Sequence, residues 1–264
     1  LDKRPYLLPF LISIAHDLTG YRPLNAFALN VLLAAVCLGL AGWIARHLSG
    51  SRGAAVLVMV LLATTPLFGQ NATGSGLEML NLTLIAALAV ATILYLELPD
   101  DSDRLSLLAV TTVLLAQSRY ESVLFSVAAA GVIATGWWRA RRMVLPWALL
   151  ATPLLLIPWA WHSRIVDSRP QLWELREGES ARFSWRYVSG NLEGAWEFFR
   201  SVSPGQPGSL ALVLLGMAGA FALVARILRR SPAPLPARAV AVAWVGLGVA
   251  AHFVVVQFYY WARF

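Results

Sequence analysis

LNAFALNVLLAAVCLGLAGWIAR, residues 24–46, carries no charge before its last residue, Arg46. A helix needs about 20 consecutive apolar residues to cross the hydrocarbon core of a bilayer. The stretch therefore predicts a membrane-spanning helix. The residues that follow, 46–53, read RHLSGSRG. A short basic segment with two glycines is typical of a cytoplasmic turn between two spans.

The rest of the chain repeats this pattern. Of its 264 residues, 58% are hydrophobic and 13% are charged, whereas soluble domains carry about 25% charged residues. Further apolar segments are expected at 54–68, 77–96, 105–116, 123–138, 144–161, 210–228 and 239–258. The predicted fold class is all-α: a polytopic transmembrane helical bundle with about eight membrane segments.

The net charge of +7 would suggest nucleic acid as the partner of a soluble protein. In a membrane protein, arginines in the loops follow the positive-inside rule and contact lipid headgroups. Membrane lipids are therefore the expected partners, and nucleic acid is not.

Two membrane segments differ from a simple span. Residues 105–116 are too few to cross upright at about 1.5 Å per residue. With 123–138 they flank a polar tip, Gln117–Ser122, which predicts helices that end inside the protein beneath an aqueous cavity. Residues 144–161 contain three prolines, Pro146, Pro153 and Pro158, and these are expected to bend the segment.

Two stretches are too polar to span. Residues 1–23 place charges and prolines before a short apolar run, Phe10–Ala15, which predicts a helix lying on the membrane surface. The insert at 162–208 is expected to form external amphipathic helices. We interpret 1–264 as one transmembrane domain whose residues 1–23 end a first external loop. Both ends look cut, as in part of a longer protein.

The loops predict an orientation. Basic turns at Arg46, Arg139 and Arg226 fall on one side, with Arg104 on the same side by alternation, and the positive-inside rule makes that side cytoplasmic. The N-terminal stretch, the insert and the heads of two segments share the other side. The expected location is the inner (plasma) membrane of a cell envelope, with the polar face toward the periplasm or exterior.

Several polar residues on that face are candidates for a site, and each has a plainer interpretation. Glu78 is a general base or metal ligand, or an acid favoured by the helix dipole. Arg119 and Glu121 are an anion clamp or a local ion pair. Lys3 contacts phosphate or is a solvated terminus. His162 and Arg164 are ligands, or a structural hydrogen-bonder and a snorkelling arginine.

Other common motifs are missing from the sequence. It contains no Walker motif, dinucleotide fingerprint or zinc-ligand spacing. His16 and Asp17 are neighbours, and adjacent residues on a helix do not face one metal.

The order of these features resembles the GT-C superfamily of membrane glycosyltransferases, and most closely the group of protein O-mannosyltransferases, lipid A aminoarabinose transferases and bacterial core-sugar transferases. The family's "KPPL" signature resembles Asp2-Lys3-Arg4-Pro5-Tyr6-Leu7 followed by Gly20. Its "SPLF" exit before an acid resembles Thr65-Pro66-Leu67-Phe68 with Glu78, and its "TRxE" helix tip resembles Ser118-Arg119-Tyr120-Glu121. Its "PW" span end resembles Pro158-Trp159, and its "RF" pair resembles Arg182-Phe183. Arg4 replaces the signature's first proline, and Glu78 stands where Asp is usual. The family's catalytic acid lies upstream of this chain.

The resemblance implies inverting transfer of a sugar from a polyprenyl-phosphate donor to a lipid, glycan or protein. Within this chain, Glu78 is the carboxylate expected to have a catalytic role, either supporting the acceptor or holding a divalent metal (Mg²⁺ or Mn²⁺). The donor phosphate would be bound by Lys3, Arg119, Arg164 and Arg182, with Tyr6, Glu121 and His162 in supporting roles. The alternatives are a secondary transporter or flippase for an anionic lipid or sugar, and a membrane scaffold without chemistry.

Overall fold

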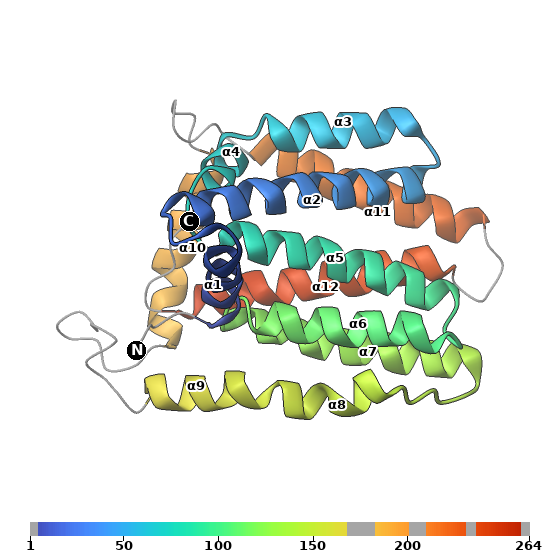
Figure 1. Ribbon diagram of the computed structural model, residues 1–264. Coiled ribbons are helices and arrows are strands. Elements are labelled where there is room, and N and C mark those ends of the chain that lie inside the picture. Colours follow the sequence, from blue (N-terminus) through green and yellow to red (C-terminus); the bar gives the residue numbers. More distant parts are fainter. Residues whose placement is uncertain (1–4, 168–182, 201–209, 231–235, 260–264) are drawn as a thin grey trace.

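The structure is a computed structural model that describes residues 5–167, 183–200, 210–230 and 236–259. These ranges are helical, apart from connecting turns and one isolated bridge between Phe183 and Tyr259. Figure 1 shows the long helices side by side in one bundle, with α1 and α10 lying across one end. The helices are α1 (Leu7–Thr19), α2 (Leu24–Ser49), α3 (Arg52–Ala63), α4 (Pro66–Ala72), α5 (Glu78–Glu97), α6 (Ser102–Ala116), α7 (Leu124–Ala140), α8 (Trp147–Leu155), α9 (Ile157–Asp167), α10 (Val188–Arg200), α11 (Leu210–Arg230) and α12 (Ala237–Gln257), with 3₁₀ turns η1 (Glu121–Val123) and η3 (Trp185–Tyr187).

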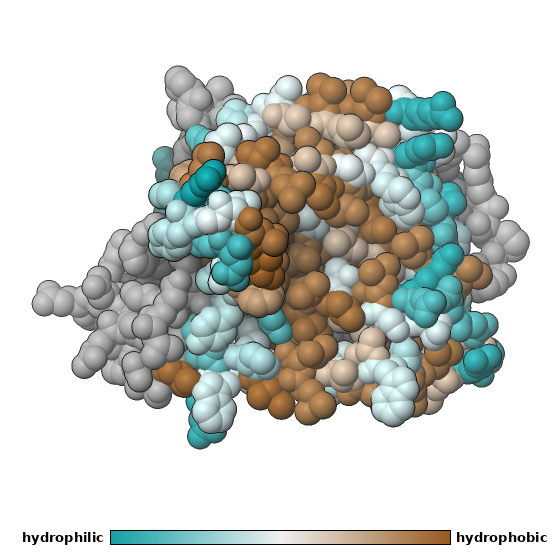
Figure 2. Space-filling view, in the orientation of Figure 1, coloured by the Kyte–Doolittle hydropathy of each residue, from teal (hydrophilic) through white to brown (hydrophobic). Residues whose placement is uncertain are grey.

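Four helices of the described ranges are long and apolar enough to cross a membrane: α2, α5, α7 together with η1, and α12. The number rises to five if α3 and α4 form one bent span. Figure 2 shows apolar side chains over the middle of the bundle. The exposed apolar residues of the helices include Leu32, Val56 and Val127. An apolar surface of this extent fits a protein surrounded by lipid. The expected total of about eight spans is not shown.

The second predicted span is broken. Residues 54–68 were expected to form one helix, but α3 and α4 are bent by 73° relative to each other. The break lies at Thr65, whose backbone is extended (ψ 118°) immediately before Pro66. A residue before proline is pushed out of the helical region, and proline itself lacks an N–H, so the helix stops and restarts.

The prediction of two short helices around the 117–122 tip is half right. The first, α6, has 15 residues, and its Leu105, Leu108 and Leu115 are 0% exposed. A short helix is tolerated there because protein surrounds it. The second is longer than predicted: η1 and α7 together run over 20 residues, Glu121–Ala140, and qualify as a span.

Residues 144–161, whose prolines were expected to bend one segment, form two helices. α8 and α9 are interrupted at Leu156, and Pro153 lies inside α8. Pro158 has no N–H to donate to the preceding turn, so the break leaves carbonyls without helical partners. The side-chain amide of Gln117 donates to the carbonyl of Leu155 (2.8 Å) and satisfies one of them.

Close approaches by two glycines hold α7 in the bundle. A Cβ on Gly136 would overlap the ring of Tyr95, which is 0% exposed, and a Cβ on Gly131 would overlap the indole of Trp244. Trp244 also donates Nε1–H to Thr135 Oγ1 (3.1 Å). Glycine at these two positions therefore permits α5 and α12 to pack against α7.

Gly131→Ala is expected to lower stability by about 1–3 kcal/mol, because the added methyl must displace a packed indole. The measurement is the unfolding midpoint of the protein in detergent micelles. Gly39→Ala is the matched control, since a Cβ there meets nothing within 4 Å and alanine favours a helix by up to about 1 kcal/mol. Equal stability of the Gly131 variant and wild type would contradict this packing.

The two ends of the bundle differ in character. One, here called the basic end, is formed by the α2–α3, α5–α6 and α7–α8 turns with Arg46, Arg104 and Arg139, and hydrophilic side chains gather there in Figure 2. Glu97 closes it by pairing with His47 Nε2 (2.7 Å) and Arg238 Nε (3.3 Å). The opposite end, here called the site end, holds α1, α10 and the 117–122 loop.

The insert is helical where it is described. α10 contains the predicted amphipathic segment Leu192–Phe199, and Asn191 anchors it by donating Nδ2–H to the carbonyls of Gln257 (2.7 Å) and Tyr259 (2.8 Å). The expected start of the insert needs correction, since His162 lies within α9. Residues 168–182 and 201–208 of the insert lie outside the described ranges.

Candidate functional site

A buried amide fixes the 117–122 loop at the site end. Asn81 Oδ1 accepts hydrogen bonds from Ser118 Oγ (2.8 Å) and Ser122 Oγ (2.6 Å), and all three side chains are buried. Asn81 lies one turn after Glu78, the first residue of α5. The head of α5 and the loop that carries Arg119 are therefore held together at one end of the bundle.

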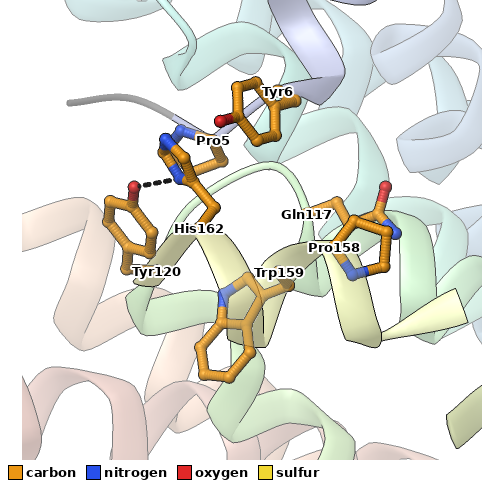
Figure 3. Close-up of a pocket in the computed structure, with 7 residues that line it drawn as sticks. All are labelled: Pro5, Tyr6, Gln117, Tyr120, Pro158, Trp159 and His162. Atoms are coloured by element: carbon orange, nitrogen blue, oxygen red, sulfur yellow. Dashed lines mark hydrogen bonds between the residues drawn. The ribbon is translucent and has the colours of Figure 1, made fainter. Parts of the chain in front are cut away.

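An aromatic cluster joins this loop to two other segments (Figure 3). His162 of α9 is 1% exposed, and its Nδ1 is hydrogen-bonded to the Tyr120 hydroxyl (2.6 Å). The ring of Tyr6, at the start of α1, packs on the imidazole with centroids 4.1 Å apart. Tyr120 stacks on it from the loop, with centroids 5.8 Å apart.

The cluster borders a small cavity of about 30 Å³. The volume suits one or two water molecules, so the cavity is a junction between segments and is too small for a sugar. Trp159 Nε1–H is buried and has no acceptor within the described ranges. A buried donor of this kind favours an oxygen ligand. The lining residues are Pro5, Tyr6, Gln117, Tyr120, Pro158, Trp159 and His162.

The predicted phosphate-binding residues are placed unequally. Arg119 Nε lies 3.5 Å from Glu121 Oε2, with 37% and 24% of the two side chains exposed. This is the local ion pair that the sequence offered as the alternative to an anion clamp. The pair also keeps the Arg119 guanidinium at the site end. Arg164 is exposed on α9. Lys3 and Arg182 lie outside the described residues.

Glu78 shares the site end with Arg119, but neither of them lines a cavity described here. The Glu78 side chain is exposed and its carboxylate folds against Gly76. It forms no ion pair with any residue that the structure describes. The expected common cavity of Lys3, Glu78 and Arg119 stays a prediction.

A metal at Glu78 also stays a prediction. Within residues 5–167 and the other described ranges, no three His, Cys, Asp or Glu side chains group closely enough to hold an ion. The described side chains therefore do not make a complete metal site.

A larger hollow of about 480 Å³ lies beneath α1, on the side of the α4–α5 link. Its polar lining includes His16, Asp17 and Tyr21, which the sequence did not identify as binding residues. His16 and Asp17 are adjacent in the sequence, and they were considered there only as possible metal ligands. The other lining residues are Pro5, Leu8, Pro9, Ile12, Ser13, Ser75 and Leu77.

Asn81→Leu is expected to lower stability by about 1–3 kcal/mol, because the buried Ser122 hydroxyl loses its acceptor. Ser118 keeps a bond to the Leu115 carbonyl (2.7 Å) and should contribute less. The measurement is the unfolding midpoint of Asn81→Leu, of Ser122→Ala and of the double variant Asn81→Leu/Ser122→Ala. The double variant should recover part of the loss, and strict additivity would contradict the coupling.

No protein-family model matches the chain, and no curated protein sequence does so. Among solved structures, ArnT from Cupriavidus metallidurans bound to undecaprenyl phosphate matches 96% of this chain with a TM-score of 0.50 and 18% sequence identity. The same protein in the apo state matches 96% with a TM-score of 0.48 and 17% identity. This chain spans 50% and 49% of those two chains, about half their length. At this identity the likeness is one of fold.

Proposed function

We propose that the chain is part of an integral-membrane glycosyltransferase that transfers a sugar from a polyprenyl-phosphate donor. The observation that carries the proposal is the meeting of three separate sequence motifs around one cavity (Figure 3). Pro5 and Tyr6 come from the first motif, Tyr120 from the third, and Pro158 and Trp159 from the fourth. The first motif is more than 100 positions from the other two in the sequence, and a transferase site needs its motifs to meet in this way.

The fold supports the same conclusion. The ArnT structure that matches almost all of this chain was solved with undecaprenyl phosphate, a polyprenyl phosphate. ArnT is a GT-C aminoarabinose transferase, a class that the sequence motifs already suggested. We therefore assign the donor to the polyprenyl-phosphate class, and place the site end at the external face of the inner membrane.

The proposed reaction is an inverting displacement. A carboxylate removes the proton of the acceptor hydroxyl, and the oxygen attacks the anomeric carbon from the side opposite the phosphate. The bond between the anomeric carbon and the phosphate oxygen breaks, and polyprenyl phosphate leaves with the bonding electrons. Glu78 is the proposed base. Fixed cations stabilise the leaving phosphate, a role we assign to Lys3, Arg119, Arg164 and Arg182.

The experiment is transfer of labelled sugar from a polyprenyl-phosphate donor by the full-length protein in lipid nanodiscs. Arg119→Ala should lower kcat/KM by about 10–100-fold, since a charged hydrogen bond contributes about 1.5–3 kcal/mol. Arg52→Ala is the control, because Arg52 is an exposed arginine of the basic end. Wild-type protein that transfers no sugar from any polyprenyl donor would overturn the proposal.

One observation favours the alternative of a transporter or flippase. The 73° bend between α3 and α4 resembles the broken helices of transporters. A flippase moves the intact donor lipid across the bilayer and leaves its sugar bound. Translocation of labelled donor without sugar release, in vesicles that contain the protein, would identify this activity.

A further inference from the structure

The hollow beneath α1 changes in polarity along its length. Leu8 and Ile12 line it toward the first half of α1, and His16 and Asp17 toward the second half. These residues recur at the spacing of one helix face. Leu77 and Ser75 form part of the wall opposite α1. The hollow, of about 480 Å³, has the size and the mixed lining of small-molecule sites.

A buried asparagine determines how His16 presents its ring. Asn25 is 9% exposed, and its Nδ2 donates to the Gly20 carbonyl (2.9 Å) while its Oδ1 accepts from Thr19 Oγ1 (3.0 Å). These bonds fix the orientation of the amide, so Nδ2 is also the donor to His16 Nδ1 (2.8 Å). His16 Nδ1 is then an acceptor, and in the neutral ring the hydrogen is on Nε2.

The remaining polar groups of the hollow are available to a ligand. His16 Nε2–H, the Asp17 carboxylate and the Tyr21 hydroxyl have no hydrogen-bond partner in the part of the chain that the structure describes. Tyr21 is 88% exposed, and its ring packs on the His16 ring with centroids 4.4 Å apart. The hollow therefore offers a donor, an acceptor and an aromatic face from the short stretch of chain between His16 and Tyr21.

The charge of the described lining disfavours one class of ligand. Asp17 is the charged side chain among the described lining residues. Its carboxylate disfavours a phosphate, which would be repelled. It favours hydroxyl groups, which donate to a carboxylate, and an ammonium group.

We propose that this hollow binds a sugar ring that is neutral or carries an amino group. Ring hydroxyls would donate to Asp17 and accept from His16 Nε2–H, and the C–H face of the sugar would pack on Tyr21. Pro5 borders both this hollow and the cavity of the aromatic cluster, so the sugar would lie beside the junction where α1, the 117–122 loop and α9 meet. The assignment of this sugar as a substrate of the transferase rests on the proposed function. The binding of a sugar in the hollow does not rest on it.

The experiment is saturation-transfer NMR on the full-length protein in nanodiscs. The probes are methyl glucopyranoside, methyl xylopyranoside, glucosamine and glucose 1-phosphate. At least one of the first three should receive saturation and bind about tenfold more tightly than glucose 1-phosphate. Tyr21→Ala should weaken that binding about 3–10-fold, and Asp17→Asn should weaken glucosamine most.

Matched controls separate the site from general effects. Trp147→Ala removes another exposed aromatic, and Asp103→Asn another exposed carboxylate, both away from the hollow. Both should bind as wild type. Because Tyr21 is exposed, its replacement should leave folding intact and keep the test decisive. Absence of saturation in all probes, tighter binding of glucose 1-phosphate, or unchanged binding in both Tyr21→Ala and Asp17→Asn would overturn the proposal.

A second arm identifies the source of the sugar. Polyprenyl-phosphate sugar is added before the glycoside. If the donor's own sugar fills the hollow, the glycoside signal is lost. If the hollow belongs to the acceptor, the signal persists. Glycoside binding in a protein that transfers no sugar would support the hollow and separately overturn the transferase.

Discussion

Glu78→Gln is expected to lower the rate of sugar transfer about 10²–10⁴-fold, the range for loss of a general base. The amide keeps the size and polarity of the side chain but cannot take a proton at neutral pH. Because Glu78 is exposed and forms no ion pair with any described residue, the change should leave the fold intact. The measurement is kcat with saturating donor and acceptor in nanodiscs.

The helix dipole offers a competing explanation of Glu78. An acid in the first turn stabilises a helix by about 0.3–1 kcal/mol, and its loss would change stability without changing the rate. Asp103→Asn is the matched control, since Asp103 is an acid in the first turn of α6 at the basic end. If both variants transfer sugar at the wild-type rate, Glu78 is only a helix-terminal charge.

His162→Ala is expected to lower stability by about 2–5 kcal/mol, as for other large buried side chains cut back to alanine. The ring is 1% exposed and packs against Tyr6 and Tyr120. Its removal should also weaken donor binding, because α1, the 117–122 loop and α9 lose their common contact. The measurements are the unfolding midpoint in nanodiscs and the donor KM.

His162→Phe separates packing from hydrogen bonding. It keeps a ring between the tyrosines but removes the hydrogen bond between the imidazole and the Tyr120 hydroxyl, so it should recover much of the stability and less of the donor affinity. An Ala variant as stable as wild type would contradict the role of the cluster as a joint between three segments.

Hydropathy predicts the long uninterrupted spans. The predicted segments 24–46, 77–96 and 239–258 agree with α2, α5 and α12 to within a few residues. It says less about short or broken segments. α6 is less apolar than these spans and is packed among helices, so its length carries no information about bilayer thickness. The bend at Thr65 was missed because Pro66 was taken as the exit of a helix.

The site residues that belong to local sequence motifs could be predicted from the sequence. Tyr6 and His162 were both identified, and the structure brings their rings into contact. Asn81 and Gln117 were missed, because each acts on a partner at least 36 positions away. A buried amide in an apolar span is the one available signal for Asn81. His16 was considered with Asp17 as a metal ligand and rejected because the two are adjacent on a helix; its hydrogen bond to Asn25, beyond the end of α1, was missed.

The break between α8 and α9 has a mechanical consequence. A proline break is commonly a hinge, yet α9 and its break are attached to the 117–122 loop at two points, Gln117 to Leu155 and Tyr120 to His162. Leu155 ends α8 and His162 lies in α9, so the two attachments stand on either side of the break, about 10 Å apart along the segment. Both sides of the break are tied to one loop, which restrains the break as a hinge. Arg119 lies between the two attached residues of that loop, so its position is coupled to the angle between α8 and α9.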